Sequence, residues 1–84
     1  MNSVDMSVRE IMAAVFGIKA ASIDAGASAE TIEAWDSLQH LNLILALEER
    51  FGIQLSVDEI TSVNNYASIV SLVSRHLNGR PSSL

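Results

Sequence analysis

Hydrophobic residues recur every three or four positions in three segments of the chain, the spacing that places side chains on one face of an α helix. The apolar face of the first segment consists of Val4, Val8, Ile11 and Val15. This pattern predicts an amphipathic helix over residues 4–16. Gly17 follows directly and supplies a helix stop.

The second segment is the most apolar and predicts a helix over residues 37–51. The residues expected to face the core are Leu38, Leu41, Ile44, Leu47 and Phe51, with Leu43, Leu45 and Ala46 widening the apolar arc. Asp36 precedes the helix as an N-cap, Gln39 three residues later completes a capping-box pattern, and Gly52 ends the helix. A helix this apolar is either buried centrally or exposes an apolar strip for binding.

Two more helices follow. Ser56 and Glu59 form a capping box that opens a short helix through Thr61. Ser68 is expected to cap the last helix, residues 68–78, in which Arg75 and His76 suit the negative end of the helix dipole. The apolar face of this last helix consists of Ile69, Val70, Val73 and Leu77, and Gly79 followed by Pro81 ends it.

The segment from Gly17 to Trp35 lacks a helical stripe and reads as an extended connection with one turn over residues 29–32. Loops of this length are often functional. The residues expected to pin the loop to the core are Ile18, Ile23, Ile32 and Trp35, with the indole sealing the loop against the helices. The predicted fold is all-α, a small four-helix bundle of three main helices and one short helix with a long loop between the first two.

Composition limits the chain to one small domain. The 84 residues are 49% hydrophobic and include no cysteine, so the core forms without disulfides or thiolate metal sites. We expect a single domain over residues 1–84, with its core over 4–78 and a flexible tail over 79–84. Without an uncharged apolar stretch of about 20 residues or a basic N-terminal leader, we expect no membrane insertion, a cytoplasmic location and a monomer.

Charge is concentrated in the middle of the chain. The net charge is −5, and eight of the ten carboxylates lie between residues 24 and 59, where Arg50 is the only basic side chain. Nucleic acid is an unsuitable partner because phosphate binding needs clustered lysine and arginine. The acidic segment favours partners with basic patches, although acidic charge also serves simply to keep a small domain soluble.

Ser37 is the strongest candidate for a functional residue. It falls in the first turn of the 37–51 helix, where unpaired backbone N–H groups and the helix dipole favour an anion such as a phosphate ester. A nucleophile activated by His40 or His76 is disfavoured, because His40 lies one turn away on the same helix and no Gly-x-Ser-x-Gly elbow is present. A plain helix-cap serine is the remaining alternative.

Metal binding is also disfavoured. The paired carboxylates Glu48 with Glu49, and Asp58 with Glu59, are adjacent in sequence and therefore diverge on a helix. No histidine lies at ligand spacing from either pair. We therefore expect no metal, no catalytic residue and no enzymatic activity of the chain itself.

The residues around Ser37 resemble the modification site and second helix of acyl carrier proteins. The resemblance rests on Asp36-Ser37-Leu38, the leucine-rich helix behind it, Glu48-Glu49 and Phe51-Gly52-Ile53, and it extends over most of the chain. It implies that a phosphopantetheinyl transferase attaches a 4′-phosphopantetheine arm from coenzyme A to Ser37. The thiol of the arm would then carry acyl groups as thioesters to acyl-loading and acyl-processing enzymes of fatty-acid, polyketide or related metabolism.

The resemblance also implies which residues contact partner enzymes. These are Asp36, Leu38, Gln39, Asn42, Leu45, Glu48 and Glu49. Family members of fatty-acid synthesis are commonly acidic at the positions of Gln39, Asn42 and Arg50, so the front of this helix is nearly neutral. We therefore expect a carrier for a specialised pathway. Leu45 aligns with an exposed apolar position of the family, and a core position remains its alternative.

Two other functions stay open. A peptidyl or aryl carrier protein would use the same arm chemistry on a different cargo. An unmodified helical interaction module would use the acidic and apolar helix surface to bind a partner protein.

Overall fold

The computed structural model describes residues 3–78. The helices are α1 (Ser3–Phe16), the 3-10 helix η1 (Ala20–Ser22), α2 (Ser37–Phe51), α3 (Val57–Ser62) and α4 (Tyr66–Asn78). Within residues 3–78 the extended pairing consists of one isolated bridge between Ser28 and Asn65. The predicted all-α fold, with three main helices, one short helix and a long first loop, is confirmed.

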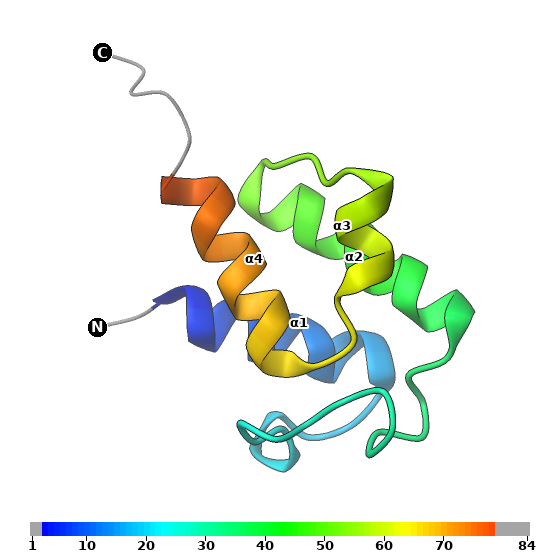
Figure 1. The fold of residues 1–84 in the computed structure, drawn as a ribbon. Helices are drawn as coiled ribbons and strands as arrows, with labels where there is room; N and C mark the ends of the chain where they lie inside the picture. Colours follow the sequence, from blue (N-terminus) through cyan, green and yellow to red (C-terminus); the bar gives the residue numbers. More distant parts are fainter. Residues whose placement is uncertain (1–2, 79–84) are drawn as a thin grey trace.

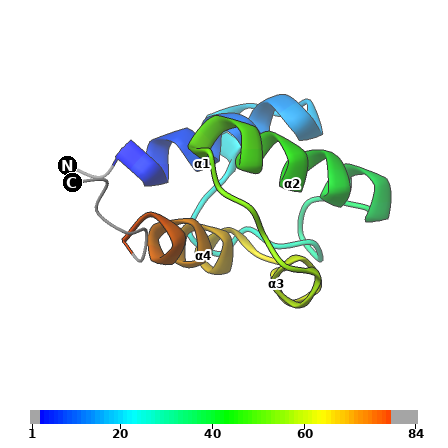
Figure 2. The same cartoon turned by 90° about the horizontal axis from the view of Figure 1, so that it is seen from above.

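The helices lie in two layers. Seen from above, α1 and α2 run side by side, and α3 and α4 lie opposite them (Figure 2). The first pair is antiparallel, because Gln39 at the start of α2 bonds the Val15 carbonyl at the end of α1. At the other end, Arg50 donates to the Ser7 hydroxyl over 3.3 Å. The long loop therefore begins and ends on the same side of the molecule (Figure 1).

The core between the layers is entirely hydrophobic among the described residues. Its fully buried larger side chains are Val8, Met12, Ile23, Leu43, Leu47, Ile69 and Val73. The expected anchors of the loop are confirmed, since Ile23, Ile32 and Trp35 are buried and Ile18 packs half-buried against them. The Trp35 indole lies on the Phe16 ring with 5.1 Å between centroids, which closes the loop over the end of α1.

The predicted core face of α2 is partly wrong. Ile44 and Leu47 are buried as expected, but Leu38 is 68% exposed and Leu41 is 53% exposed, whereas Leu43 is fully buried. The reason is that α2 carries leucine or isoleucine on most of its circumference, so several stripes fit a helical period. The contacts of α2 with α1 and α4 select the side that contains Leu43, Ile44 and Leu47.

The predicted helix ends at Gly17 and Gly52 are confirmed, and both glycines adopt a left-handed backbone with φ of 68° and 64°. The capping box at α3 is also confirmed. The Ser56 hydroxyl accepts from the Glu59 N–H, and the Glu59 carboxylate accepts from the Ser56 N–H.

The predicted start of the last helix is wrong by two residues. Helix α4 begins at Tyr66, and Asn65 rather than Ser68 provides the cap, its side-chain oxygen accepting from the Ser68 N–H over 2.7 Å. The Ser68 hydroxyl instead donates to the Asn65 carbonyl from inside the first turn. The sequence offers two adequate caps, and the burial of Tyr66 favours the earlier one. The predicted stop at Gly79 and Pro81, and the tail, lie outside the described residues.

The long loop is more ordered than its composition suggests. The predicted turn over residues 29–32 is confirmed, because the N–H groups of Thr31 and Ile32 both donate to the Ser28 carbonyl. The helix η1 was not predicted, since Ala-Ala-Ser gives no periodic signal. Backbone bonds from Ala29 to the Asn64 carbonyl and from Tyr66 to the Ala27 carbonyl tie the loop to the start of α4.

Candidate functional site

The N-terminus of α2 presents Ser37 at the surface. Asp36 has an extended backbone and caps the helix, its carboxylate accepting from the Gln39 N–H over 2.9 Å. The Asp36 carbonyl accepts the first intrahelical bond, from His40. Among the described residues, no hydrogen bond uses the N–H of Ser37 or of Leu38. The exposed Ser37 hydroxyl thus lies in a helical turn that keeps two backbone donors for an anion.

The Gln39 side chain does not complete a capping box, which corrects the sequence prediction. Its amide nitrogen donates to the Val15 carbonyl over 3.0 Å, and its amide oxygen accepts from Asn42 over 2.8 Å. Val15 lies in the last turn of α1, where carbonyls lack a helical partner and are satisfied by side chains. A carboxylate at position 39 could not donate this bond. Gln39 therefore joins two helices.

The other residues expected to contact partners divide into exposed and bonded side chains. Leu45 is 63% exposed, which excludes its core alternative. Glu49 is exposed as well. Glu48 is half-buried and accepts a hydrogen bond from the Leu55 N–H over 2.9 Å, so this carboxylate fixes the chain after α2. Leu41 is exposed between Leu38 and Leu45, and sequence reasoning missed it as a surface residue because its spacing also fits a core stripe.

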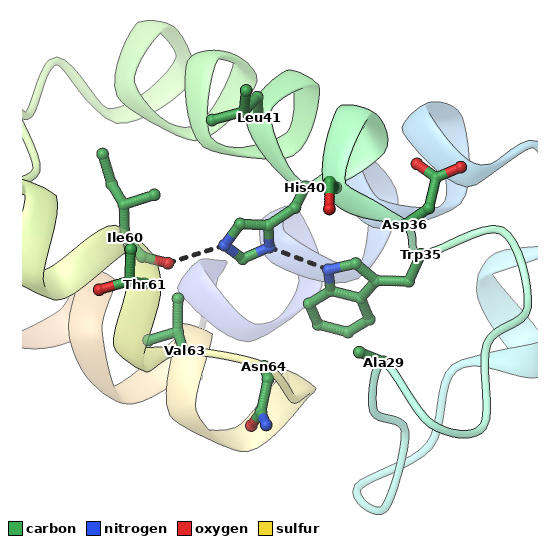
Figure 3. A pocket seen from close by; sticks show the side chains of 10 residues that line it. Ala29, Trp35, Asp36, His40, Leu41, Ile60, Thr61, Val63 and Asn64 are labelled. Carbon is green, nitrogen blue, oxygen red and sulfur yellow. Dashed lines mark hydrogen bonds between the residues drawn. The ribbon is translucent and has the colours of Figure 1, made fainter.

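A pocket of about 620 Å³ opens beside Ser37, between α2, α3 and the long loop (Figure 3). Its lining consists of Ala29, Trp35, Asp36, Ser37, His40, Leu41, Ile60, Thr61, Val63 and Asn64. The side chains of Trp35 and His40 point toward one another across it (Figure 3). Any group attached to Ser37 would therefore begin at the edge of a largely apolar recess.

His40 is half-buried and both of its ring nitrogens are engaged. The Trp35 indole N–H donates to Nδ1 over 3.0 Å, and Nε2 lies 2.7 Å from the Ile60 carbonyl oxygen. The lone pair that would make His40 a base is thus held by Trp35, which leaves this histidine unsuited to deprotonate Ser37. The bonds of His40 therefore order the residues around Ser37 and do not activate its hydroxyl.

A second histidine, His76, contacts α3 from helix α4. His76 on α4 lies 3.0 Å from both carboxylate oxygens of Glu59. The N–H of Ser56 and then His76 lower the pKa of the Glu59 carboxyl below its ordinary value of 4.5. No pattern in the sequence predicts this pair, because it depends on how α3 packs against α4.

Acid should weaken the wild-type protein more than the variant Glu59→Gln. The pKa of Glu59 is lower in the folded chain than in the unfolded chain, so its stabilising effect is present above pH 4.5 and disappears as the pH falls through the folded pKa. The glutamine keeps an oxygen for the Ser56 N–H but does not titrate. Urea unfolding at about pH 7 and about pH 3 should show a stability advantage of the wild type that shrinks with acid. An equal advantage at both values would contradict this role of Glu59.

Across positions 3–78 no group of three or more histidine, cysteine, aspartate or glutamate side chains is placed to hold a metal ion. None of the helices described for this part of the chain is long and apolar enough to cross a membrane.

Comparisons with known proteins agree with the geometry. The profile of a family described as "Phosphopantetheine attachment site" matches residues 7–73. Acyl carrier proteins of Solidesulfovibrio magneticus and Buchnera aphidicola subsp. Schizaphis graminum are each 29% identical over 73 residues, which is 87% of this chain and 94% and 92% of theirs. The solution structure of the holo acyl carrier protein of Geobacter metallireducens superimposes with a TM-score of 0.82 at 29% identity, over 94% of this chain and 91% of that one.

Proposed function

Since this chain belongs to the acyl carrier protein family, whose members carry a covalent 4′-phosphopantetheine arm, we propose that Ser37 is the residue to which the arm is attached. The observation that carries the proposal is the place of Ser37, an exposed hydroxyl in the first turn of a 15-residue helix within the matched region. The arm is joined through a phosphodiester. That anion would lie where the helix dipole and the N–H groups of Ser37 and Leu38 favour negative charge.

The attachment step transfers the arm from coenzyme A. The Ser37 oxygen attacks the phosphorus that bears the pantetheine, a new O–P bond forms, and the anhydride bond to adenosine 3′,5′-bisphosphate breaks. The hydroxyl proton must leave to a base, and because His40 is engaged by Trp35, a phosphopantetheinyl transferase is the proposed source of that base. The terminal thiol then exchanges acyl groups as thioesters, so the carrier presents cargo and other enzymes perform the chemistry.

The proposed docking surface for these enzymes is the exposed side of α2. Leu38, Leu41 and Leu45 are spaced by three and four residues and therefore lie along one face of the helix. Exposed Asp36 and Glu49 lie toward the two ends of this face. An apolar strip with carboxylates at its rim fits partners that offer an apolar groove and basic residues around it.

The internal bonds of Gln39 and Glu48 refine the set of proposed contacts. Both side chains are bonded within the fold and half-buried. The exposed residues Asp36, Leu38, Asn42, Leu45 and Glu49 therefore remain the stronger candidates for touching a partner, with Leu41 added. That the carrier serves a specialised rather than a standard fatty-acid pathway stays a prediction. It is supported by the neutral side chains of Gln39 and Asn42 at the front of α2.

The test is to incubate the unmodified chain with coenzyme A and a broad-specificity transferase. We expect the mass of the protein to increase by one phosphopantetheine, and fragmentation of the modified protein to place the arm on Ser37. Size-exclusion chromatography of the product checks the expected monomer. No gain in mass under conditions that modify a control carrier would favour the unmodified interaction module instead. Mass spectrometry of protein from its native cytoplasm would identify the cargo and separate an acyl from a peptidyl or aryl carrier.

A further inference from the structure

The hydrogen bonds of His40 fix its protonation form. The indole N–H of Trp35 can only donate, so Nδ1 of His40 must present its lone pair. The carbonyl of Ile60 can only accept, so Nε2 must carry the proton. The structure therefore holds His40 as the neutral Nε2–H tautomer, with one bond on each side of the ring.

These two bonds connect a tightly packed part of the molecule to a loosely packed one. Trp35 is buried and its indole contacts the Phe16 ring, so it belongs to the packed core. The helix α3 has no buried residue among its six, so it has little apolar packing to fix its position. His40 links the two across the pocket, from a position one turn after Ser37 (Figure 3).

We propose that His40 is a positioning residue for arm attachment, which couples α3 to Trp35 and so keeps the surface beside Ser37 in one arrangement. This inference rests on the proposed role of Ser37. A transferase that docks on a fixed surface does not have to order that surface first. If α3 were loose, only a fraction of the carrier molecules would be arranged for docking, and the apparent affinity of the transferase for the carrier would fall in proportion to that fraction. His40 acts through the two walls of the pocket and does not touch the reacting atoms.

Two conservative variants of His40 each remove one of its two hydrogen bonds and keep the other. In His40→Asn the amide oxygen takes the approximate place of Nδ1 and can still accept from Trp35, but the bond to Ile60 is lost. In His40→Gln the amide nitrogen takes the approximate place of Nε2 and can still donate to Ile60, but the bond to Trp35 is lost. Because coupling needs both bonds, we expect each variant to raise the KM of the transferase for the carrier about fivefold, the factor for one hydrogen bond, with kcat unchanged.

The matched control is His76→Gln. This change removes the ionisable partner of Glu59 and loosens α3 on a side that does not line the pocket. We expect it to lower the melting temperature without changing KM, when all assays are run well below that temperature on chains that circular dichroism shows to be folded. An equal rise of KM in His76→Gln would mean that only the general stability of α3 matters and would overturn the inference.

Nuclear magnetic resonance tests the tautomer without the arm. Long-range proton–nitrogen spectra should show a protonated Nε2 and an unprotonated Nδ1 for His40, and the indole N–H of Trp35 should exchange more slowly in the wild type than in His40→Gln. The opposite tautomer would overturn the inference. If the wild type accepts no arm, the proposed function of Ser37 fails as well. If it does and both His40 variants keep the wild-type KM, only the role of His40 fails.

Discussion

Replacing Ser37 with alanine should abolish attachment of the arm completely and leave the helical fold unchanged. The hydroxyl is the proposed nucleophile, and alanine offers no oxygen to form the phosphodiester. The side chain is exposed and Asp36, not Ser37, caps the helix, so we expect the free energy of unfolding to change by no more than about 0.5 kcal/mol. Intact-protein mass spectrometry after incubation with coenzyme A and transferase measures the loss, and urea unfolding measures the stability.

Ser56→Ala is the control for this experiment. Ser56 is also an exposed serine at the start of a helix, where it caps α3 through the Glu59 N–H. Losing that cap should cost about 1 kcal/mol of stability, yet the variant should accept the arm to the same extent as the wild type. Attachment to Ser37→Ala, or its loss in a folded Ser56→Ala, would show that the arm is attached elsewhere.

Truncating Leu47 should destabilise the protein far more than truncating Leu45, although the two leucines are two residues apart on α2. Leu47 is fully buried, and Leu47→Ala removes packed atoms and leaves a cavity, at a cost of about 2 to 5 kcal/mol. Leu45 is 63% exposed, so Leu45→Ala should change stability by about 0.5 kcal/mol or less. For a domain this small, the first loss approaches the whole free energy of folding.

Urea unfolding followed by circular dichroism measures both variants. Leu45→Ala should instead lower the affinity for partner enzymes, because it removes an apolar side chain from the proposed docking surface. Similar losses of stability in the two variants would show that the face of α2 assigned to the core is wrong. Unchanged docking of a stable Leu45→Ala would remove this leucine from the docking surface.

The local features of this chain could be predicted from its sequence. The bounds of α2 followed from Asp36 and Gly52, because a cap and a left-handed glycine act within one helical turn. Placement of Ser37 in the first turn of that helix needed no tertiary information. The capping box of α3 and the burial of Trp35 were predictable for the same kind of reason, since a capping bond spans three residues and a large indole next to helices is usually buried.

The features that required the structure connect residues distant in sequence. The bond of Gln39 to Val15 spans 24 residues, that of His40 to Ile60 spans 20, and that of His76 to Glu59 spans 17. Each is set by how helices pack, and helical periodicity does not determine which of several apolar stripes faces inward. The same ambiguity placed Leu38 and Leu41 in the expected core.

The bond between Gln39 and Val15 connects the start of the proposed docking surface to the packing of α2 against α1. Position 39 is where fatty-acid carriers of the family commonly have a carboxylate, and in this chain its amide nitrogen holds α2 against the end of α1. Restoring an acid there would add charge for a basic partner, but it would also set a carboxylate against a carbonyl oxygen. A substitution at position 39 that adds charge to the proposed docking surface is therefore expected to weaken the pairing of α1 with α2.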